Sequence, residues 1–512
     1  MNTQRGNDHE IGTDPRTGQL LPPGLPVTTT SQLETVCAAA AAASPWLAEQ
    51  SPAERGVLLR AGADAIDADG DEIVRAADEE SAMGAQKLRG ELARTTGQLR
   101  FLADVVEEGS YLEVTIDHTA GGADLRRCER PIGPVAVFSA SNFPLAFSLA
   151  GGDTAAALAV GCPVIVKSHP THPNTSRIVA QALRRALASL DAPDGVLGVV
   201  SGWDAGRSLV MDDRVRAVAF TGSTQGGLAI AELVRGRDRP IPVFAEMGST
   251  NPVVVTSAAL EAHADDIIEG FAASFQLGVG QFCTKPGLLF VPAGAVTDVL
   301  TRTQQHFHEP APLLSEGISD AWRERSRRWA TLTGGEQLEP DARPGFWATP
   351  QLFATTATDL ATSEVLREEC FGPTALVVGY EAEEDLVSAL EAVGGSLTGT
   401  LWSGGAETKG LATAALAALQ QSSGRIVHNG WPTGVAVSWA MQHGGPFPST
   451  TSPEHTSVGA ASIKRFLRPL AVQNAPHGFL PPPLRDDNPW RLPRRIDGRL
   501  ELAPQPVPGE ER

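Results

Sequence analysis

The chain has 512 residues, more than one hydrophobic core usually supports, so we expect at least two domains. Hydrophobic residues make up 42% and charged residues 20%, which is ordinary for a globular protein. The formal net charge of -19, with no Lys/Arg cluster to offset it, argues against a nucleic-acid partner and an acidic membrane surface.

The five cysteines are scattered and lack the spacing of a zinc site, so they predict a reducing, cytoplasmic location and no metal. Residues 1–24 are polar and broken by Pro and Gly, so we see no signal peptide. Residues 146–166 approach membrane-spanning length, but Gly151, Gly152 and Gly161 interrupt them. We therefore expect a buried helix followed by a buried strand there, and no membrane span.

The hydrophobic pattern changes once along the chain. Residues 32–106 are Ala-rich with charges at helical spacing, which predicts helices. After residue 131, short apolar runs alternate with amphipathic stretches, first at 135–138, 163–166, 196–200, 215–220 and 242–244, and then at 287–291, 375–380, 398–402 and 425–429. This alternation is typical of βαβ units that form parallel sheets covered on both faces. The fold class is therefore α/β, with two Rossmann-like open parallel-sheet domains.

These patterns also suggest domain boundaries. Residues 1–110 and 131–246 are expected to form a dinucleotide-binding domain, and residues 247–445 a catalytic domain. Residues 111–130 and 466–473 alternate polar and apolar, and the tail from residue 481 is rich in Pro, Arg and Asp. We expect residues 111–130 and 463–512 to form an oligomerisation ribbon and an extended C-terminal arm, in a homodimer or homotetramer.

Three reactive side chains stand in turns near predicted strands. Cys283 follows a glycine-rich turn, Glu246 ends a short apolar strand, and Asn142 follows the strand at 135–138. Each has a simpler interpretation, such as a packed thiol, a salt-bridged acid or a turn former. Their joint occurrence favours a nucleophile, a base and an amide donor that together carry out covalent chemistry on a carbonyl.

A phosphate-binding turn is predicted at residues 220–227, between an apolar strand and a helix. Thr224 breaks the GxGxxG spacing, so a plain strand-to-helix turn is about as plausible from this motif alone. Lys167 ends another strand, where it could bind an adenosine ribose or simply be solvated. His169, His172, His443 and His455 have no cysteine or carboxylate at ligand spacing, and we interpret each as structural or solvent-facing.

Taken in order, these motifs resemble the aldehyde dehydrogenase superfamily over roughly residues 28–476. The resemblance rests on residues 142–144, Lys167, residues 220–223, Glu246 with Gly248 and residues 251–252, residues 280–283 and residues 368–373. A narrower likeness, to the α-ketoglutaric semialdehyde (2,5-dioxopentanoate) dehydrogenase branch, rests on residues 139–148, 151–154, 167–173 and 444–450.

The resemblance implies NAD(P)-dependent oxidation of an aldehyde through a cysteine thiohemiacetal and thioester. The expected substrate is 2,5-dioxopentanoate, converted to 2-oxoglutarate. One alternative is a fatty or aromatic aldehyde dehydrogenase, and another is a catalytically silent scaffold with this fold.

In the implied mechanism Cys283 attacks as a thiolate, and Asn142 with the Cys283 amide stabilises the oxyanion. Glu246 activates the hydrolytic water. The expected cofactor residues are Lys167, Ser168, His169, Gly222, Ser223, Glu369 and Phe371. Phe143, Lys285, His443 and Arg94 are candidate substrate residues, the last three as cations for a distal carboxylate.

The cofactor preference is predicted from one departure. Many NAD-preferring members carry a glutamate three residues after the lysine, where it would repel a 2′-phosphate, and here that position is Pro170. We therefore expect either NADP or NAD, with NADP slightly favoured.

Overall fold

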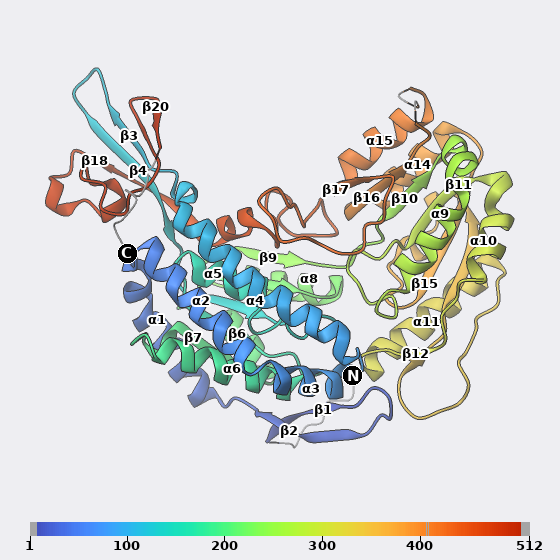
Figure 1. Cartoon of the computed structure of the whole chain (residues 1–512), viewed down its shortest axis with the longest axis horizontal. Helices are drawn as coiled ribbons and strands as arrows, with labels where there is room; N and C mark the ends of the chain where they lie inside the picture. The colour runs from blue at the N-terminus through green and yellow to red at the C-terminus, as the bar shows by residue number, and fades with distance from the viewer. Residues whose placement is uncertain (1–7, 406, 408, 503–512) are drawn as a thin grey trace.

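The computed structural model describes residues 8–405, 407 and 409–502, arranged around two parallel sheets and a third, largely antiparallel sheet (Figure 1). No helix among the described residues is long and apolar enough to cross a membrane.

Four helices precede the first parallel sheet: α1 (Thr30–Glu49), α2 (Pro52–Ala68), α3 (Gly70–Ser81) and α4 (Ala85–Glu108). Their starting points follow from local chemistry. The Ser51 hydroxyl accepts from the Glu54 amide while the Glu54 carboxylate accepts from the Ser51 amide, and Thr29 forms the same reciprocal cap with Gln32. These caps satisfy amides that the first helical turn leaves without partners.

The first parallel sheet has the strand order β7-β6-β5-β8-β9. Its strands are β5 (Val135–Phe138), β6 (Val164–Lys167), β7 (Leu197–Val200), β8 (Ala217–Thr221) and β9 (Val243–Glu246). The intervening helices are α5 (Gly152–Ala159), α6 (Pro173–Ala188), α7 (Trp203–Met211) and α8 (Thr224–Arg235). Helices cover both faces, so the strands are nearly continuous apolar runs.

The second parallel sheet has the order β14-β15-β11-β10-β16-β17. Its strands are β10 (Pro252–Val255), β11 (Leu288–Pro292), β14 (Gln351–Thr356), β15 (Thr374–Tyr380), β16 (Ser396–Trp402) and β17 (Ser423–His428). Its helices are α9 (Ser257–Gln276), α10 (Val296–Gln304), α11 (Glu316–Thr333), α12 (Ala357–Thr362), α13 (Glu364–Arg367), α14 (Glu383–Val393) and α15 (Leu411–Ser422). A short pair, β12 (Ala311–Pro312) and β13 (Trp347–Ala348), lies apart from this sheet. The predicted pair of parallel sheets is confirmed.

The third sheet stands away from both parallel sheets in Figure 1. Its order is β18-β4-β3-β19-β20, formed by β3 (Thr115–His118), β4 (Asp124–Pro131), β18 (Leu467–Gln473), β19 (Arg494–Ile496) and β20 (Arg499–Glu501). The expectation of an extended arm after residue 481 was wrong for residues 494–501, because β19 and β20 form a hairpin and β19 pairs with β3.

A hairpin at the beginning of the described chain was not predicted. β1 (His9–Thr13) pairs with β2 (Leu20–Pro26), with register shifts that make the pairing irregular. Prolines and glycines in this segment obscure the strand pattern, which is why the sequence predicted no strands there. The hairpin lies along the first parallel sheet's helices (Figure 1).

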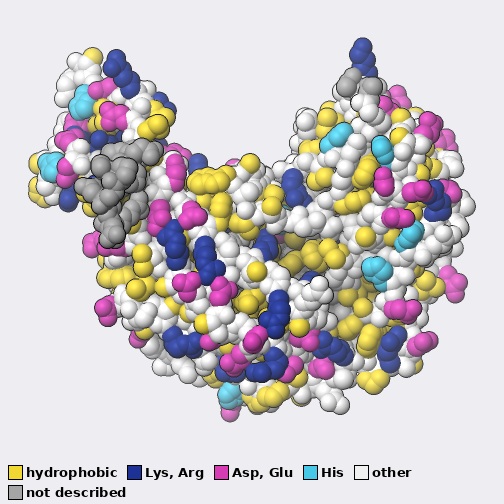
Figure 2. All heavy atoms as spheres, viewed as in Figure 1, with side chains coloured by type: hydrophobic (Ala, Val, Ile, Leu, Met, Phe, Trp, Pro, Cys, Tyr) yellow, Lys and Arg dark blue, Asp and Glu magenta, His cyan; other side chains and the backbone are white. Residues whose placement is uncertain are grey.

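A deep notch separates the protruding third sheet from the lobe built on the second parallel sheet (Figure 2). On the face drawn, acidic and basic side chains of the described residues are interspersed. Residues 247–251 connect β9 of the first parallel sheet with β10 of the second, and this junction positions the site.

Candidate active site

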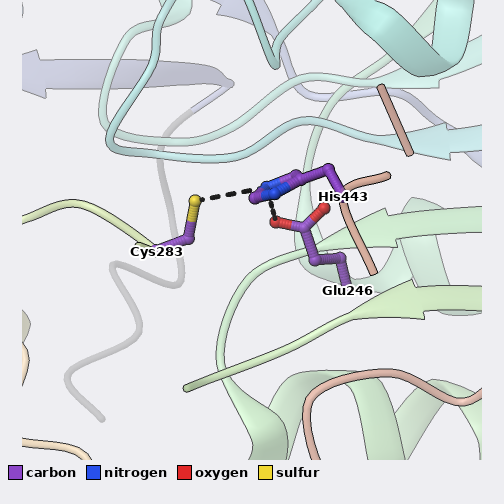
Figure 3. A group of neighbouring side chains, drawn as sticks. All are labelled: Glu246, Cys283 and His443. Carbon is purple, nitrogen blue, oxygen red and sulfur yellow. Dashed lines mark hydrogen bonds and ion pairs between the residues drawn. The ribbon is translucent and has the colours of Figure 1, made fainter. Parts of the chain in front are cut away.

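Three side chains from distant segments meet at the junction of the two parallel sheets (Figure 3). Glu246 ends β9, Cys283 lies between α9 and β11, and His443 lies in the long segment after β17. The Cys283 Sγ is 3.5 Å from His443 Nε2, which is 3.0 Å from Glu246 Oε1. One ligand atom from each residue lies within 4.8 Å of the other two. The imidazole therefore stands between the thiol and the carboxylate.

The segment containing His443 is held against β9 by backbone pairing. The Met247 amide donates to the Ser449 carbonyl at 2.8 Å, and Thr450 forms an isolated bridge with Glu246. Further on, the Ser457 amide donates to the His443 carbonyl at 2.8 Å. These bonds fix the imidazole against the carboxylate, although the residues are far apart in sequence.

Asn251 holds the nucleophile loop against this junction. Its side-chain amide donates to the carbonyls of Cys283 at 2.8 Å and Lys285 at 2.9 Å, and its oxygen accepts from the Thr398 hydroxyl at 3.0 Å. Asn251 is fully buried and has φ +50°, a conformation that asparagine tolerates better than most residues. One side chain therefore connects the linker, the Cys283 loop and β16.

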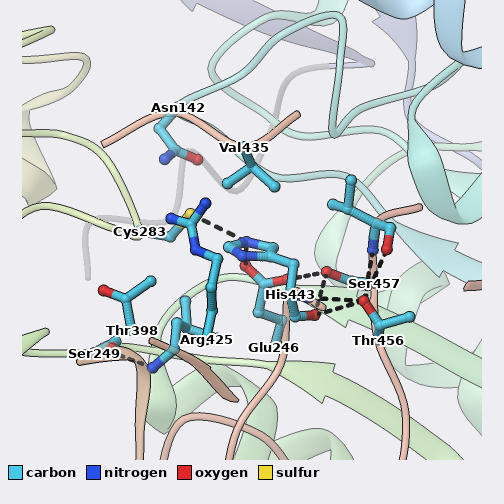
Figure 4. A network of polar contacts seen from close by, with 12 residues as sticks. Asn142, Glu246, Ser249, Cys283, Thr398, Arg425, Val435, His443, Thr456 and Ser457 are labelled. Atoms are coloured by element: carbon cyan, nitrogen blue, oxygen red, sulfur yellow. Dashed lines mark hydrogen bonds and ion pairs between the residues drawn. The ribbon is translucent and has the colours of Figure 1, made fainter. Parts of the chain in front are cut away.

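Glu246 is ionised in this setting. Burial alone would raise the pKa of the carboxyl, but His443, the Ser457 hydroxyl and the more distant Arg465 outweigh it, so the pKa lies below its ordinary value. Ser457 donates to Glu246 Oε2 (Figure 4). The carboxylate is thus available as a base at neutral pH.

Cys283 differs from the sequence-based expectation of a thiolate. Burial raises the pKa of the thiol well above its ordinary value, and the charges of Glu246 and Glu369 raise it further, against an opposing effect of Arg94. In this conformation the thiol is protonated and needs a proton acceptor in order to attack. The nearest candidate is His443 Nε2.

The solvent-facing interpretation of His443 was wrong, and so was the premise that it has no cysteine or carboxylate nearby; its assignment as a substrate cation stays a prediction. His443 is 1% exposed and has both a cysteine and a carboxylate as neighbours. The earlier interpretation considered only neighbours at short sequence spacing, whereas Cys283 is 160 positions away. No local pattern could have revealed this contact.

Asn142 reaches the nucleophile loop as predicted for an oxyanion donor. Its Nδ2 donates to the Gln281 carbonyl at 2.9 Å, and in Figure 4 the side chain points toward Cys283. An amide nitrogen carries two donors, so the second remains for an oxygen bound near Cys283. Phe143 next to it packs edge-on against Phe282 at 5.0 Å and also contacts Phe147, forming an aromatic wall.

Lys285 does not serve as a cation for substrate. Its ammonium is 1% exposed and donates to the carbonyls of Cys370, Gly372 and Thr374, at 2.5, 3.1 and 2.8 Å. An ammonium group has three donors, so all of them are used within the protein. Lys285 ties the nucleophile loop to the start of β15, and this candidate is withdrawn.

Two arginines approach the thiol instead. Arg94 lies over the Phe147 ring at 4.9 Å and donates to the Val435 carbonyl at 3.3 Å, and its Nη1 is buried without a partner among the described residues. Arg425, which the sequence reading missed, is drawn beside Cys283 in Figure 4, and its buried Nε likewise has no partner in the described part of the chain. Burial lowers the pKa of both arginines, and the charge of Glu91 is the largest opposing effect on Arg94.

The phosphate-binding turn has the geometry expected of one. Ser223 caps α8 by accepting from the Gly226 amide at 3.1 Å, and the Gly222 amide donates to the Glu246 carbonyl at 3.0 Å. A Cβ on Gly222 would lie 2.7 Å from Phe220 Cζ, so a larger residue there would have to displace the Phe220 ring. A helix N-terminus with a bare backbone next to it suits a pyrophosphate.

Glu369 comes close to the same turn. A Cβ on Gly248 would lie 2.5 Å from Glu369 Oε2 and 3.1 Å from the Thr224 hydroxyl, so the bare backbone leaves room for the carboxylate. Burial raises the pKa of Glu369 to about 7, with Lys285 and the Ser249 amide acting in the opposite direction. Phe371 follows two residues later and is partly buried. The assignment of these residues to the dinucleotide stays a prediction.

At the end of β6, Lys167 and Ser168 contact an acid that the sequence gave no reason to place there. The Lys167 ammonium is 3.5 Å from Glu10 Oε1, and the Ser168 hydroxyl donates to Glu10 Oε2 at 2.9 Å. Burial lowers the pKa of His169 well below its ordinary value, and His172 and Lys167 act in the same direction. His169 is therefore neutral and supplies no positive charge for a phosphate.

The fold is that of a dinucleotide-dependent oxidoreductase, and its predicted nucleophile, Cys283, and predicted base, Glu246, meet at the junction of the two parallel sheets. The chain matches the Aldehyde dehydrogenase family over residues 12–311 and 318–469 and belongs to that family. It is an NAD(P)-dependent aldehyde oxidoreductase, as predicted from the sequence.

Individual relatives narrow the comparison. The chain is 42% identical to alpha-ketoglutaric semialdehyde dehydrogenase 2 of Azospirillum brasilense, over 95% of each chain. It is 38% identical to alpha-ketoglutaric semialdehyde dehydrogenase of Acinetobacter baylyi, over 84% of each. Among solved structures, the NAD-dependent aldehyde dehydrogenase from Sinorhizobium meliloti has a TM-score of 0.77 at 23% identity, covering 91% of this chain and 92% of that one. The predicted resemblance and fold class are confirmed.

Proposed function

We propose that the protein oxidises α-ketoglutaric semialdehyde (2,5-dioxopentanoate) to 2-oxoglutarate, with Cys283 as nucleophile and NAD(P) as hydride acceptor. The observation that carries the choice of substrate is the pair of arginines near Cys283, each with a buried N–H that has no partner among the described residues. An unpaired buried donor is costly, and a carboxylate on the substrate would satisfy both. The names of the two similar relatives support the same substrate.

In the first step the Cys283 Sγ bonds to the aldehyde carbon and its proton passes to His443 Nε2, which accepts it when the neutral imidazole carries its own proton on Nδ1. Glu246, 3.0 Å from that nitrogen, stabilises the imidazolium. The developing oxyanion accepts from Asn142 Nδ2 and the Cys283 amide, and each such donor typically contributes about 3 kcal/mol. The nicotinamide, when bound, supplies the acceptor for the hydride that leaves this carbon.

The cysteine thioester that remains is then hydrolysed. Glu246 takes a proton from the attacking water, the C–S bond breaks, and the carboxylate product leaves the thiol free. This assignment is supported by the lowered pKa of Glu246 and its position beside the thiol. We assign Gly222 and Ser223 to the pyrophosphate, Glu369 and Phe371 to the nicotinamide ribose and ring, and Lys167 with Ser168 to the adenosine ribose.

The test is an aldehyde panel with both cofactors. It compares 2,5-dioxopentanoate with pentanal, a chain of similar length without the distal carboxylate, and with long-chain and aromatic aldehydes. The highest kcat/KM is expected for the semialdehyde. A clear preference for pentanal or longer apolar aldehydes would contradict the proposed substrate.

The alternative of a fatty or aromatic aldehyde dehydrogenase is favoured by one observation, the aromatic wall of Phe143, Phe147 and Phe282. The same panel tests it. The scaffold alternative is disfavoured because Cys283, Glu246 and Asn142 are all retained at one site.

We also propose a cytoplasmic homodimer or homotetramer assembled through the third sheet. The protruding sheet has β18 as a free edge strand in the described chain. The described cysteines are all free, which supports a reducing compartment. Size-exclusion chromatography with light scattering tests the assembly.

A further inference from the structure

The carboxyl end of the first parallel sheet contains a charged group that comes from outside the sheet. Ligands bind at the carboxyl ends of strands in open parallel sheets, and an acid there often accepts the ribose 2′-hydroxyl. Lys167 ends β6, and Gly202 precedes α7 at the end of β7. Glu10 joins them, because its Oε1 accepts from the Gly202 amide at 2.8 Å and lies 3.5 Å from the Lys167 ammonium.

The hairpin that carries Glu10 is fastened to this edge. The Ser201 amide donates to the Thr28 hydroxyl at 2.9 Å, the Thr28 amide donates to the Ser201 carbonyl at 3.1 Å, and the Ser201 hydroxyl donates to the Pro26 carbonyl. On its other side the hairpin backbone approaches α6 closely, since a Cβ on Gly24 would lie 2.6 Å from Pro173. The carboxylate of Glu10 is therefore held in place, and its side chain is 9% exposed.

The Glu10 carboxylate also keeps a free acceptor position. Its two oxygens offer about four lone-pair sites, and the described donors are the Gly202 amide, the Lys167 ammonium and the Ser168 hydroxyl. Oε2 has only the Ser168 hydroxyl as a partner among the described residues. Glu10 Oε2 can therefore accept a hydrogen bond from a ribose hydroxyl next to Lys167.

The same arrangement is unfavourable for a 2′-phosphate. The charge of Lys167 is already offset by Glu10, and the neighbouring His169 is neutral because burial lowers its pKa. A phosphate at the ribose 2′ position would bring about two negative charges against a fixed carboxylate.

We propose that Glu10 is the coenzyme-specificity residue of this protein: it accepts the adenosine ribose 2′-hydroxyl and disfavours NADP, so that NAD is the preferred cofactor. The inference rests on the proposed assignment of Lys167 to the adenosine ribose. It opposes the sequence-based expectation that NADP is slightly favoured, which considered only Pro170 and the residues beside Lys167.

The test is direct binding of NAD and NADP by calorimetry, without aldehyde, to the wild type and to Glu10→Gln. The wild type is expected to bind NAD at least about tenfold more tightly than NADP, and Glu10→Gln to reduce that ratio at least about tenfold through tighter NADP binding. Glu10→Asp keeps the wild-type preference. The matched control Asp8→Asn removes an exposed charge from the same part of the chain and leaves the ratio unchanged.

Two results would overturn the inference. The first is that the wild type binds NADP as tightly as NAD. The second is that Glu10→Gln lowers the affinity for both nucleotides equally, as expected of a purely structural role. If Glu10→Gln does not fold, competition on the wild type decides. ADP-ribose should displace NAD at a concentration where 2′-phospho-ADP-ribose does not. Failure of both nucleotides to bind would overturn the proposed function as well, whereas binding without discrimination would overturn this inference alone.

Discussion

Two acid–base pairs lie at the carboxyl ends of different strands of the first parallel sheet. At the sheet junction Glu246 faces His443, and the third neighbour is a thiol that must lose a proton before it reacts. At the end of β6 Glu10 faces Lys167, and the other neighbours are a hydroxyl and a backbone amide. The first pair can move a proton during the reaction, while the second has no reacting neighbour and acts as a fixed charge. In the roles that we propose, similar residue pairings serve catalysis in one place and coenzyme selection in the other.

The strongest test of the junction is removal of the sulfur. Cys283→Ala should lower turnover by at least about 10⁴-fold, because no other nucleophile is assigned to this reaction. NAD binding, measured by calorimetry, should stay close to wild type. Cys128→Ala is the control, since this cysteine is buried in β4, outside the site. Appreciable dehydrogenase activity in Cys283→Ala would refute the mechanism.

Removing the imidazole tests whether the first pair moves a proton. His443→Gln should lower kcat/KM by about 10²–10⁴-fold at pH 7, the usual contribution of a general base. The pKa of Cys283 is raised, so thiolate forms only as pH rises, and the loss should shrink steadily toward pH 10. The pH profile of kcat/KM is the measurement.

His455→Gln is the control for this variant, because His455 packs against Phe244 and not against the thiol. A loss of activity in His443→Gln that is the same at every pH would indicate a structural role for the imidazole.

Substitution of Arg425 tests whether positive charge near Cys283 also selects the substrate. Arg425→Gln should raise the KM for 2,5-dioxopentanoate about tenfold to a hundredfold, since a hydrogen bond to a charged group is worth about 1.5–3 kcal/mol. The KM for pentanal should change little, because that aldehyde has no carboxylate. An equal effect on both aldehydes would assign Arg425 to loop structure through its bonds to the carbonyls of Pro432 and Gly434.

The smallest expected effect concerns Glu369, a titrating acid next to Gly248. Its pKa is about 7 and the ionised form is the better acceptor for ribose hydroxyls, so NAD affinity should rise about tenfold from pH 6 to pH 8. Calorimetry at several pH values measures this rise. In Glu369→Gln the pH dependence should disappear, and its persistence there would contradict the assignment.

The sequence was sufficient to predict the features that depend on residues close together in the chain. Apolar runs identified the strands of the first parallel sheet and four strands of the second, but not β10 or β14. Turns and strand ends near these runs pointed to Cys283, Glu246 and Asn142. What it could not provide were contacts between distant segments. His443 reaches Glu246 only because residues 449–451 pair along β9, and Lys285 is buried by carbonyls from residues 370–374. Glu10 was missed because Pro and Gly hid the hairpin that carries it.

The hairpin of residues 9–26 has a consequence for how coenzyme choice can change. It forms a two-stranded sheet of its own, separate from the parallel sheet next to which we propose that the cofactor binds. Substitutions within the hairpin therefore leave the strands of that sheet, Cys283 and His443 unchanged. Evolution or protein engineering could therefore change whether the enzyme uses NAD or NADP by replacing this hairpin alone, with the catalytic residues kept. Truncated variants that begin at α1 should lose the preference for NAD even if they still fold.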